Sequence, residues 1–204
     1  MQKPEFYPMF TGIIETLGTI TETGTRGSNT TFWIESNLAP ELRPDQSVAH
    51  DGVCLTVEAV QDGRHRVTAI AETLEKTALR SWQPGRIVNL ERCLPANGRF
   101  DGHFVQGHVD TTGTCTKVRD RDGSREYTFR FPKKFAHLMV EKGSITVNGI
   151  SLTAFDLGKN SFRVAIIPYT LQHTNLGGLA EGEPVNLEFD LLGKYIHRKL
   201  SLKA

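Results

Sequence analysis

Short runs of alternating apolar and polar residues make up most of this chain, and turn residues separate them at regular intervals. The alternation predicts strands over residues 10–20, 30–35, 57–60, 65–71 and 87–93, and another centred on Cys54. Asp-Gly pairs at 62–63 and 122–123 lie between such runs and are typical of hairpin turns. Helical patterns are short, at 39–42 and 132–141. We therefore expect an all-β fold of antiparallel strands that form barrels or sandwiches.

The chain repeats this pattern. Residues 47–57, SVAHDGVCLTV, recur at 144–154 as SITVNGISLTA, and the same offset pairs 72–91 with 169–188. Both copies end on Val-Asn-Leu-Glu. The sequence therefore predicts one unit of about a hundred residues used twice. We divide the chain into an N-terminal extension, a first domain, a second domain and a tail, at residues 1–8, 9–104, 105–189 and 190–204.

The tail changes to a helical period. Its apolar residues fall on one face of the expected helix, and its basic residues lie mostly opposite or near the end, where cations suit the helix dipole. The apolar residues are Leu191, Leu192, Tyr195, Ile196 and Leu200. A lone helix of about 15 residues is marginal in water, so this face needs a partner. A neighbouring subunit and the end of the second domain are the two candidates.

Composition excludes several classes of partner. The net charge is +1, from 24 basic and 23 acidic residues, which gives no basic stripe for a phosphate backbone. No apolar run approaches the about 20 residues that cross a bilayer. Cys54, Cys93 and Cys115 form no CxxC pair, and no leader precedes the first domain, so we expect a reducing cytoplasm. We expect no nucleic-acid partner, no membrane and no metal.

The repeated strand carries candidate chemistry. If Leu55 faces the core, Cys54 and Thr56 face a surface or pocket, and Ser151 and Thr153 do the same in the second copy. One copy thus offers a thiol where the other offers a hydroxyl. A cysteine on a strand is more often inert filler than a nucleophile, so both interpretations stay open.

Two histidines lie five residues apart in GRFDGHFVQGHVD. On a strand, His103 and His108 would point to opposite faces, which disfavours a shared metal. His108 follows Gly107, so a ligand can approach it closely, and it can move protons near neutral pH. A structural hydrogen-bonding role is the competing interpretation. From the residues alone, the chain is a duplicated β protein with two related ligand-sized sites.

Several longer motifs follow one another from Phe10 to the tail. They are FTGIIE, SVAHDGVCLTV, AETL, VNLER, GRFDGHFVQGHVD, GSITVNGISLTA, IPYTLQHTNL and VNLEFD. In this order they resemble the riboflavin synthase family. The resemblance implies two similar six-stranded antiparallel Greek-key β-barrels, both lumazine-binding, and a C-terminal helix that holds three subunits together. It also implies a dismutation without a cofactor, in which two molecules of 6,7-dimethyl-8-ribityllumazine give riboflavin and 5-amino-6-(ribitylamino)uracil by four-carbon transfer.

The resemblance also implies site residues. The implied catalytic residues are Phe10, Cys54, His108, Lys142, Ser151 and Asp190. The implied substrate-binding residues are Gly12, Ile13, Ile14, Ser47, Cys54, Leu55, Thr56, Thr68, Ala69, Ile70, Ala71, Glu72, Thr73, Gly107, His108, Val109, Lys142, Ser151, Leu152, Thr153, Ala165, Ile166, Ile167, Pro168, Tyr169 and Thr170. Cys54 or Ser151 would activate the nucleophile that adds to the acceptor ring, and His108 would move the methyl proton.

The family further implies partners. The first barrel of one subunit would meet the second barrel of its neighbour in a homotrimer, and lumazine synthase is an expected associate. The competing function is a lumazine- or flavin-binding antenna protein without chemistry. A barrel pair that binds no pteridine at all is a third class. The joint presence of Cys54, His108, Lys142 and Ser151 favours the enzyme, a transferase. Two departures from the family pattern are the extension before Met9 and Asp51, where asparagine is frequent.

Overall fold

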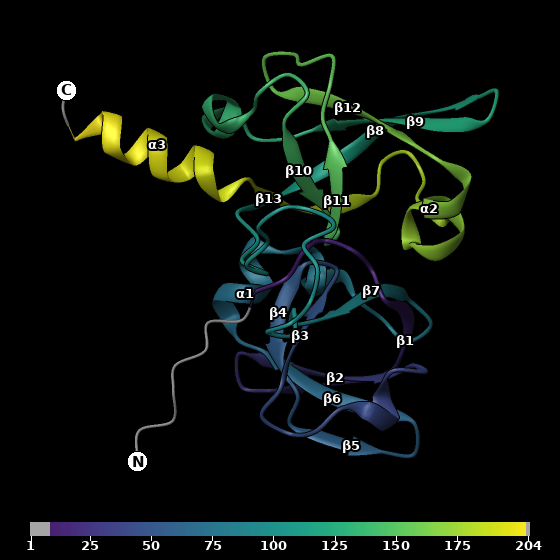
Figure 1. Ribbon diagram of the computed structural model, residues 1–204. Coiled ribbons are helices and arrows are strands. Elements are labelled where there is room, and N and C mark those ends of the chain that lie inside the picture. The colour runs from purple at the N-terminus through teal and green to yellow at the C-terminus, as the bar shows by residue number, and fades with distance from the viewer. Residues whose placement is uncertain (1–8, 203–204) are drawn as a thin grey trace.

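The computed structural model describes residues 9–202, which form two β-barrels stacked on each other and a projecting C-terminal helix (Figure 1). The first barrel is a seven-stranded antiparallel sheet in the order β4-β3-β7-β1-β2-β6-β5, and the second is six-stranded in the order β11-β10-β13-β8-β9-β12. Each sheet curls until one end strand approaches the far side, where β4 lies against β6 and β11 against β12. The expected extension, 1–8, lies outside the described residues.

The elements of the first barrel are β1 (Thr16–Arg26), β2 (Asn29–Glu35), η1 (Ala39–Glu41), β3 (Ser47–His50), β4 (Val53–Thr56), β5 (Ala59–Gln61), β6 (Arg64–Ala69), α1 (Ala71–Lys76), η2 (Ala78–Ser81) and β7 (Ile87–Arg92). Those of the second are β8 (Thr111–Arg121), β9 (Ser124–Arg130), η3 (Lys133–Leu138), β10 (Ser144–Val147), β11 (Ile150–Thr153), β12 (Ser161–Ile166), α2 (Pro168–His173), η4 (Asn175–Gly178) and β13 (Pro184–Phe189). The tail forms α3 (Leu191–Ser201).

The duplicated all-β fold is confirmed, but three details of the prediction were wrong. The strand expected over 10–20 begins only at Thr16, because the residues before it leave the barrel and Gly12 has a φ of 79°. The strand expected over 65–71 ends at Ala69, and a six-residue helix follows that is too short to show a helical period. The first barrel has seven strands and not the implied six: the strand expected over 57–60 is present as β5, whereas its counterpart in the second barrel is a single bridge between Phe155 and Arg163.

Two equivalent hairpin turns hold the barrels together. Asp51 and Asn148 precede Gly52 and Gly149, and all four residues have positive φ angles, as type I′ turns require. A Cβ atom on either glycine would lie 2.7 Å from the backbone nitrogen of the other, so the two turns touch through their backbones.

Asparagines connect the two turns to the sheets. The Nδ2 of Asn89 donates to the Asn148 carbonyl at 2.9 Å, and the Nδ2 of Asn186 donates to the Asp51 carbonyl at the same distance. The contact between the barrels thus has an approximate twofold symmetry, and buried side chains satisfy its polar groups.

The core of the first barrel contains a histidine pair that the second barrel lacks. His50 and His65 are fully buried in the first barrel, where the second barrel has Val147 and Phe162. The Nδ1 of His50 lies 3.0 Å from the Val48 carbonyl and therefore carries the proton, so its Nε2 accepts from His65 Nε2 at 2.8 Å. Burial lowers the pKa of His65 to about 4, and burial and the charge of His65 lower the pKa of His50 well below its usual value.

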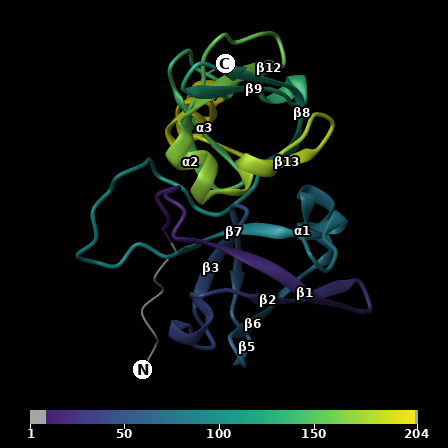
Figure 2. The same cartoon turned by 90° about the vertical axis from the view of Figure 1, so that its right-hand side faces the viewer.

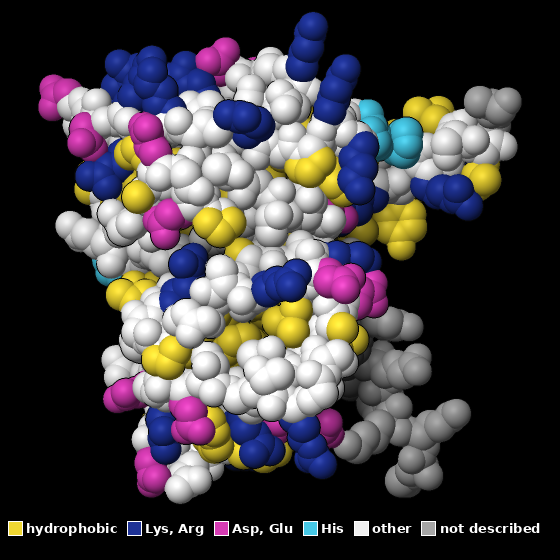
Figure 3. All heavy atoms as spheres, turned by 180° about the vertical axis from the view of Figure 1, so that it is seen from behind, with side chains coloured by type: hydrophobic (Ala, Val, Ile, Leu, Met, Phe, Trp, Pro, Cys, Tyr) yellow, Lys and Arg dark blue, Asp and Glu magenta, His cyan; other side chains and the backbone are white. Residues whose placement is uncertain are grey.

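The apolar face of α3 points away from the barrels. The helix rests on the second barrel through its polar face, where Lys194 Nζ lies 2.6 Å from Asp110 and the centre of the tilted His197 ring lies 3.8 Å from that of His137. Four of the five apolar residues of the predicted face, Leu192, Tyr195, Ile196 and Leu200, are 60–69% exposed, and Leu191 is half-buried. Figure 3 shows the helix extending beyond the barrel with hydrophobic side chains on its surface. This geometry excludes the end of the second domain as the partner of this face.

Within residues 9–202, no helix combines the length and the apolar character needed to span a membrane.

The histidine pair predicts acid sensitivity of the first barrel. A histidine with a lowered pKa binds protons more weakly when folded, so stability falls as the pH drops below about 6.5 and levels off near pH 4. Replacing the pair with the residues of the second barrel, His50→Val with His65→Phe, should remove this loss, which is about 3 kcal/mol for His65 alone. Urea unfolding at pH 7.5 and 4.5 measures the loss of unfolding free energy in the wild type and in the variant. Parallel losses in wild type and variant would contradict the prediction.

Candidate functional site

The segments that precede β1 and β8 cross between the barrels. Phe10 N–H donates to the Val105 carbonyl at 2.8 Å, and Val105 N–H donates back to Phe10 at 3.2 Å. Beyond this bridge, the Gly12 carbonyl accepts from Ser151 N–H at 2.8 Å, and the Gly107 carbonyl accepts from Cys54 N–H at 2.9 Å. Figure 2 shows the segment before β1, in purple, reaching toward the second barrel. Each site thus combines a strand of one barrel with the segment that leads into the other.

Glycine is required at both crossings. Gly12 and Gly107 have φ angles of 79° and 75°, which L side chains rarely adopt. A Cβ atom on Gly12 would lie 2.7 Å from the Cβ of Ser151, and one on Gly107 would lie 2.6 Å from the Cβ of Cys54. The backbone therefore lies directly over the thiol-bearing residue in one site and the hydroxyl-bearing residue in the other.

Two equivalent glutamates anchor the crossing segments. Glu91 accepts from the backbone N–H groups of Thr11 and Gly12 at 2.7 and 3.0 Å, and Glu188 accepts from Gln106 and His108 at 2.7 and 3.0 Å. Burial raises the pKa of Glu91 to about 7, against the opposing effect of these N–H donors, and burial also raises the pKa of Glu188.

The Ser151 site is a cavity of about 240 Å³ beside α2. It is lined by Gly12, Ile13, Ile14, Ile150, Ser151, Leu152, Tyr169, Thr170, His173 and Thr174. The structure thus gathers seven of the residues that the sequence proposes for substrate binding, from the crossing segment, β11 and α2. It adds Ile150, His173 and Thr174, and the ring of His173 stacks on that of Tyr169 at 4.0 Å.

Ser151 has a histidine partner that the sequence analysis did not choose. His103 Nδ1 lies 2.7 Å from Ser151 Oγ, and His103 Nε2 lies 3.2 Å from Thr146 Oγ1. Burial lowers the pKa of His103, and the nearby charge of Asp190 opposes this effect. A neutral imidazole with Nε2 protonated can accept the Ser151 proton, so the pair has the arrangement of a hydroxyl with its general base.

A signal for His103 was present in the sequence. Each of the two histidines follows a glycine, and the argument that favoured His108 applies equally to His103. Gly102 lies so close to the crossing segment that a Cβ atom would overlap the Thr11 carbonyl oxygen at 1.9 Å. His108 itself is exposed, and its backbone N–H is the group that contacts Glu188.

The Cys54 site has the same backbone arrangement as the Ser151 site, but it carries a thiol in place of the hydroxyl. The Cys54 side chain is half-buried and hydrogen-bonds to Ser47, and burial raises the pKa of its thiol. The thiol therefore stays protonated near neutral pH and suits hydrogen bonding better than nucleophilic attack. Cys54 and Thr56 point away from the core, as predicted, whereas Val53 and Leu55 point into it.

Phe10, Lys142 and Asp190 do not line the Ser151 cavity. Phe10 is fully buried between Ala49 and Val105, and a Cβ atom on Gly107 would lie 3.0 Å from its ring, so it supports the crossing rather than facing open space. Lys142 Nζ lies 4.9 Å from the centre of the Phe155 ring.

Asp190 caps α3 by accepting from Leu192 N–H at 2.9 Å. The side chains of Ala69 and Ile166 point into the barrel cores, which leaves only their backbones for a ligand.

Asp51 lies in the contact between the barrels. It is fully buried, and it accepts from Asn89 N–H and Asn175 Nδ2, both at 2.8 Å. Burial raises the pKa of Asp51 to about 7. Within the described residues, no group of three His, Cys, Asp or Glu side chains is arranged to hold a metal ion.

Substitution of Gly12 should disturb the Ser151 site. In Gly12→Ala the new methyl group would collide with Ser151 and occupy an unfavourable φ, so we expect a loss of stability beyond the about 1–2 kcal/mol of the backbone strain alone. Gly27→Ala is the matched control, because Gly27 has a φ of 63° but no atom within 4 Å of its Cβ position. Urea unfolding compares the two variants. Equal losses would contradict the contact with Ser151.

Comparisons with known proteins agree with this duplicated plan. The lumazine binding domain family matches residues 11–93 and 106–190. The riboflavin synthase of Actinobacillus pleuropneumoniae is 41% identical over 96% of this chain and 91% of its own, and that of Bacillus amyloliquefaciens is 40% identical over 94% and 90%.

Solved structures share the fold. The crystal structure of LumP complexed with 6,7-dimethyl-8-(1'-D-ribityl) lumazine matches with a TM-score of 0.80 at 19% identity, over 88% of this chain and 98% of LumP. At this identity the match shows the fold alone. The two domain matches and the identity to these enzymes over nearly the whole chain establish that it belongs to the riboflavin synthase family, with two lumazine-binding domains.

Proposed function

We propose that this protein catalyses the last step of riboflavin biosynthesis, a transferase reaction. Two molecules of 6,7-dimethyl-8-ribityllumazine are converted to riboflavin and 5-amino-6-(ribitylamino)uracil. The observation that carries the proposal is the pair of equivalent sites, one with Cys54 and the other with Ser151 and its base His103. Donor and acceptor are the same molecule in this reaction, so two sites with one backbone plan and different chemistry suit it. The reaction conserves all atoms and needs no cofactor.

The two sites divide the roles. In the Ser151 site, His103 accepts a proton through Ser151, and the pair activates or positions the nucleophile that adds to the acceptor ring. In the Cys54 site, the exposed imidazole of His108 takes the methyl proton of the donor, and the neutral thiol donates a hydrogen bond. The crossing glycines let the residues that follow them, Ile14 and Val109 among them, approach the edge of each ring. The protein thus contributes orientation and proton transfer.

The reaction requires two lumazine sites to face each other. Contacts between subunits through the exposed face of α3 can bring them together. We place the first barrel of one subunit against the second barrel of its neighbour in a homotrimer, joined by the apolar side chains of α3. Apolar patches of this kind mark interaction surfaces. Lys142 would then act from the subunit boundary, and Phe10 would support the crossing from inside. Domain boundaries at 104/105 and 189/190, a cytoplasmic location and an association with lumazine synthase complete the proposal.

The deciding experiment is an incubation of the purified protein with 6,7-dimethyl-8-ribityllumazine alone. Riboflavin should form at half the rate at which lumazine disappears, because two substrate molecules yield one product. Binding without turnover would contradict the proposal and indicate a lumazine-binding antenna protein. The absence of any pteridine binding would exclude both functions.

Removal of the hydroxyl or its base should lower turnover. We expect Ser151→Ala and His103→Gln each to reduce kcat by about 10²-fold or more, because the first removes the hydroxyl and the second removes the base that accepts its proton. Since the pKa of His103 is lowered, wild-type kcat should fall only at pH values below about 6.5, and His103→Gln should lose this dependence. Steady-state kinetics between pH 5 and 8 measure both effects. Unchanged turnover in Ser151→Ala would refute its role.

A charge on the exposed face of α3 should prevent assembly. We expect Ile196→Lys to be monomeric and inactive but folded, because the ammonium group cannot be buried in an apolar contact. Ser201→Lys places the same charge on the opposite face of the helix and should leave both properties unchanged. Sedimentation velocity gives the oligomeric state and circular dichroism the fold. A fully active monomer would contradict the proposed site between subunits.

A further inference from the structure

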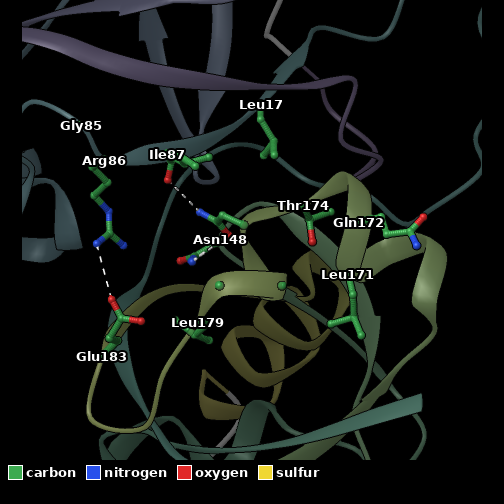
Figure 4. Close-up of a pocket in the computed structure, with 13 residues that line it drawn as sticks. Leu17, Gly85, Arg86, Ile87, Asn148, Leu171, Gln172, Thr174, Leu179 and Glu183 are labelled. Atoms are coloured by element: carbon green, nitrogen blue, oxygen red, sulfur yellow. Dashed lines mark hydrogen bonds and ion pairs between the residues drawn. The ribbon is translucent and has the colours of Figure 1, made fainter. Parts of the chain in front are cut away.

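A second and larger cavity lies between the barrels, separate from the Ser151 pocket (Figure 4). Its volume is about 500 Å³, which is within the range of small-molecule sites. Leu17 and Ile87 contribute apolar walls from the first barrel, and Leu171 and Leu179 contribute them from the second. Neither site of the proposed reaction uses this space.

The two repeats differ at one wall of this cavity. At the offset that aligns Ser151 with Cys54, Gly178 and Leu179 take the places of Ser81 and Trp82. Trp82 is fully buried in the first barrel, whereas the smaller Leu179 lines the cavity. A Cβ atom added to Gly178 would meet nothing within 4 Å, so this residue borders open space.

The polar groups of the cavity match one edge of a heterocycle. Arg86 and Glu183 occupy equivalent positions of the two barrels, and their charged atoms are 3.9 Å apart, longer than a hydrogen bond. The Nε of Arg86 is buried without a hydrogen-bond partner in the described residues. Figure 4 shows the two side chains extending toward each other across the space. A carbonyl beside an N–H group would accept from Arg86 and donate to Glu183 at once.

The helix α2 separates the two cavities. Tyr169, Thr170 and His173 line the Ser151 pocket, whereas Leu171 and Gln172 line the larger cavity. Thr174 at the end of the helix borders both. A ligand in one cavity therefore contacts a helix that also forms part of the wall of the other cavity.

We propose that this cavity is an effector site for a ring system with a cyclic imide edge, and that its occupation acts through α2 on the Ser151 pocket. The apolar walls hold the rings, and Arg86 and Glu183 hold the imide. The effect on catalysis rests on the proposed function, whereas the binding itself does not.

Alloxazine, a tricyclic imide without a side chain, is the probe. Equilibrium dialysis should find one alloxazine fewer per chain in Gly178→Leu, whose side chain projects into the cavity and obstructs a planar ligand, than in wild type. Gly178→Ser, which introduces the residue of the first barrel, is the matched control and should keep the wild-type number. Arg86→Met should weaken binding at this site at least tenfold. Equal numbers bound in wild type, Gly178→Leu and Arg86→Met would overturn the proposal, whether or not the protein forms riboflavin.

Kinetics test the connection through α2. In wild type, alloxazine should lower kcat at saturating lumazine. In Gly178→Leu it should raise only KM, because competition in the lumazine pockets is then its sole effect. A fall in kcat of equal size in both proteins would refute the effector role. Thermal unfolding of each variant establishes that it is folded before either measurement.

Discussion

The close approach of two backbone segments at the centre of the molecule is the constraint on which the rest depends. The chain enters each barrel through a segment that first contacts the other barrel, and the segments meet where Phe10 pairs with Val105. The approach leaves no room for side chains at Gly12 and Gly107, and it requires φ angles that favour glycine. The buried carboxylates of Glu91 and Glu188 then hold the free N–H groups of the segments. The crossing segments therefore determine both the contact between the barrels and the geometry of the two sites.

The same constraint explains how two copies of one unit can differ in chemistry while keeping their shape. The backbone around Cys54 and Ser151 is fixed by hydrogen bonds that involve no side chain of either residue. The two sites differ instead in the side chains themselves and in their neighbours. Ser151 contacts the imidazole of His103, whereas the Cys54 thiol lies in a site that favours its protonated form. The two sites thus differ in their side chains while their backbone contacts match.

Much of this architecture could be predicted from the sequence, because alternation and repetition are local properties. The inward positions of Val53 and Leu55, the face of α3 and the equivalence of Cys54 with Ser151 all follow from periodicity or alignment. The crossing could not be predicted, since a strand period cannot show that residues 10–15 leave their own barrel. For the same reason His103 was assigned to a strand face, although its position depends on a tertiary contact with β10 and β11. The two six-residue helices were missed because they are shorter than two turns.

The crossing also bears on the origin of the duplicated chain. Neither half contains a complete site, since the strand with the reactive side chain and the segment over it belong to different repeats. A protein made of a single unit could have formed such sites only as a dimer, with each copy lending its leading segment to the other. Gene fusion would then have preserved an existing subunit contact inside one polypeptide and freed its two formerly identical pockets to evolve separately.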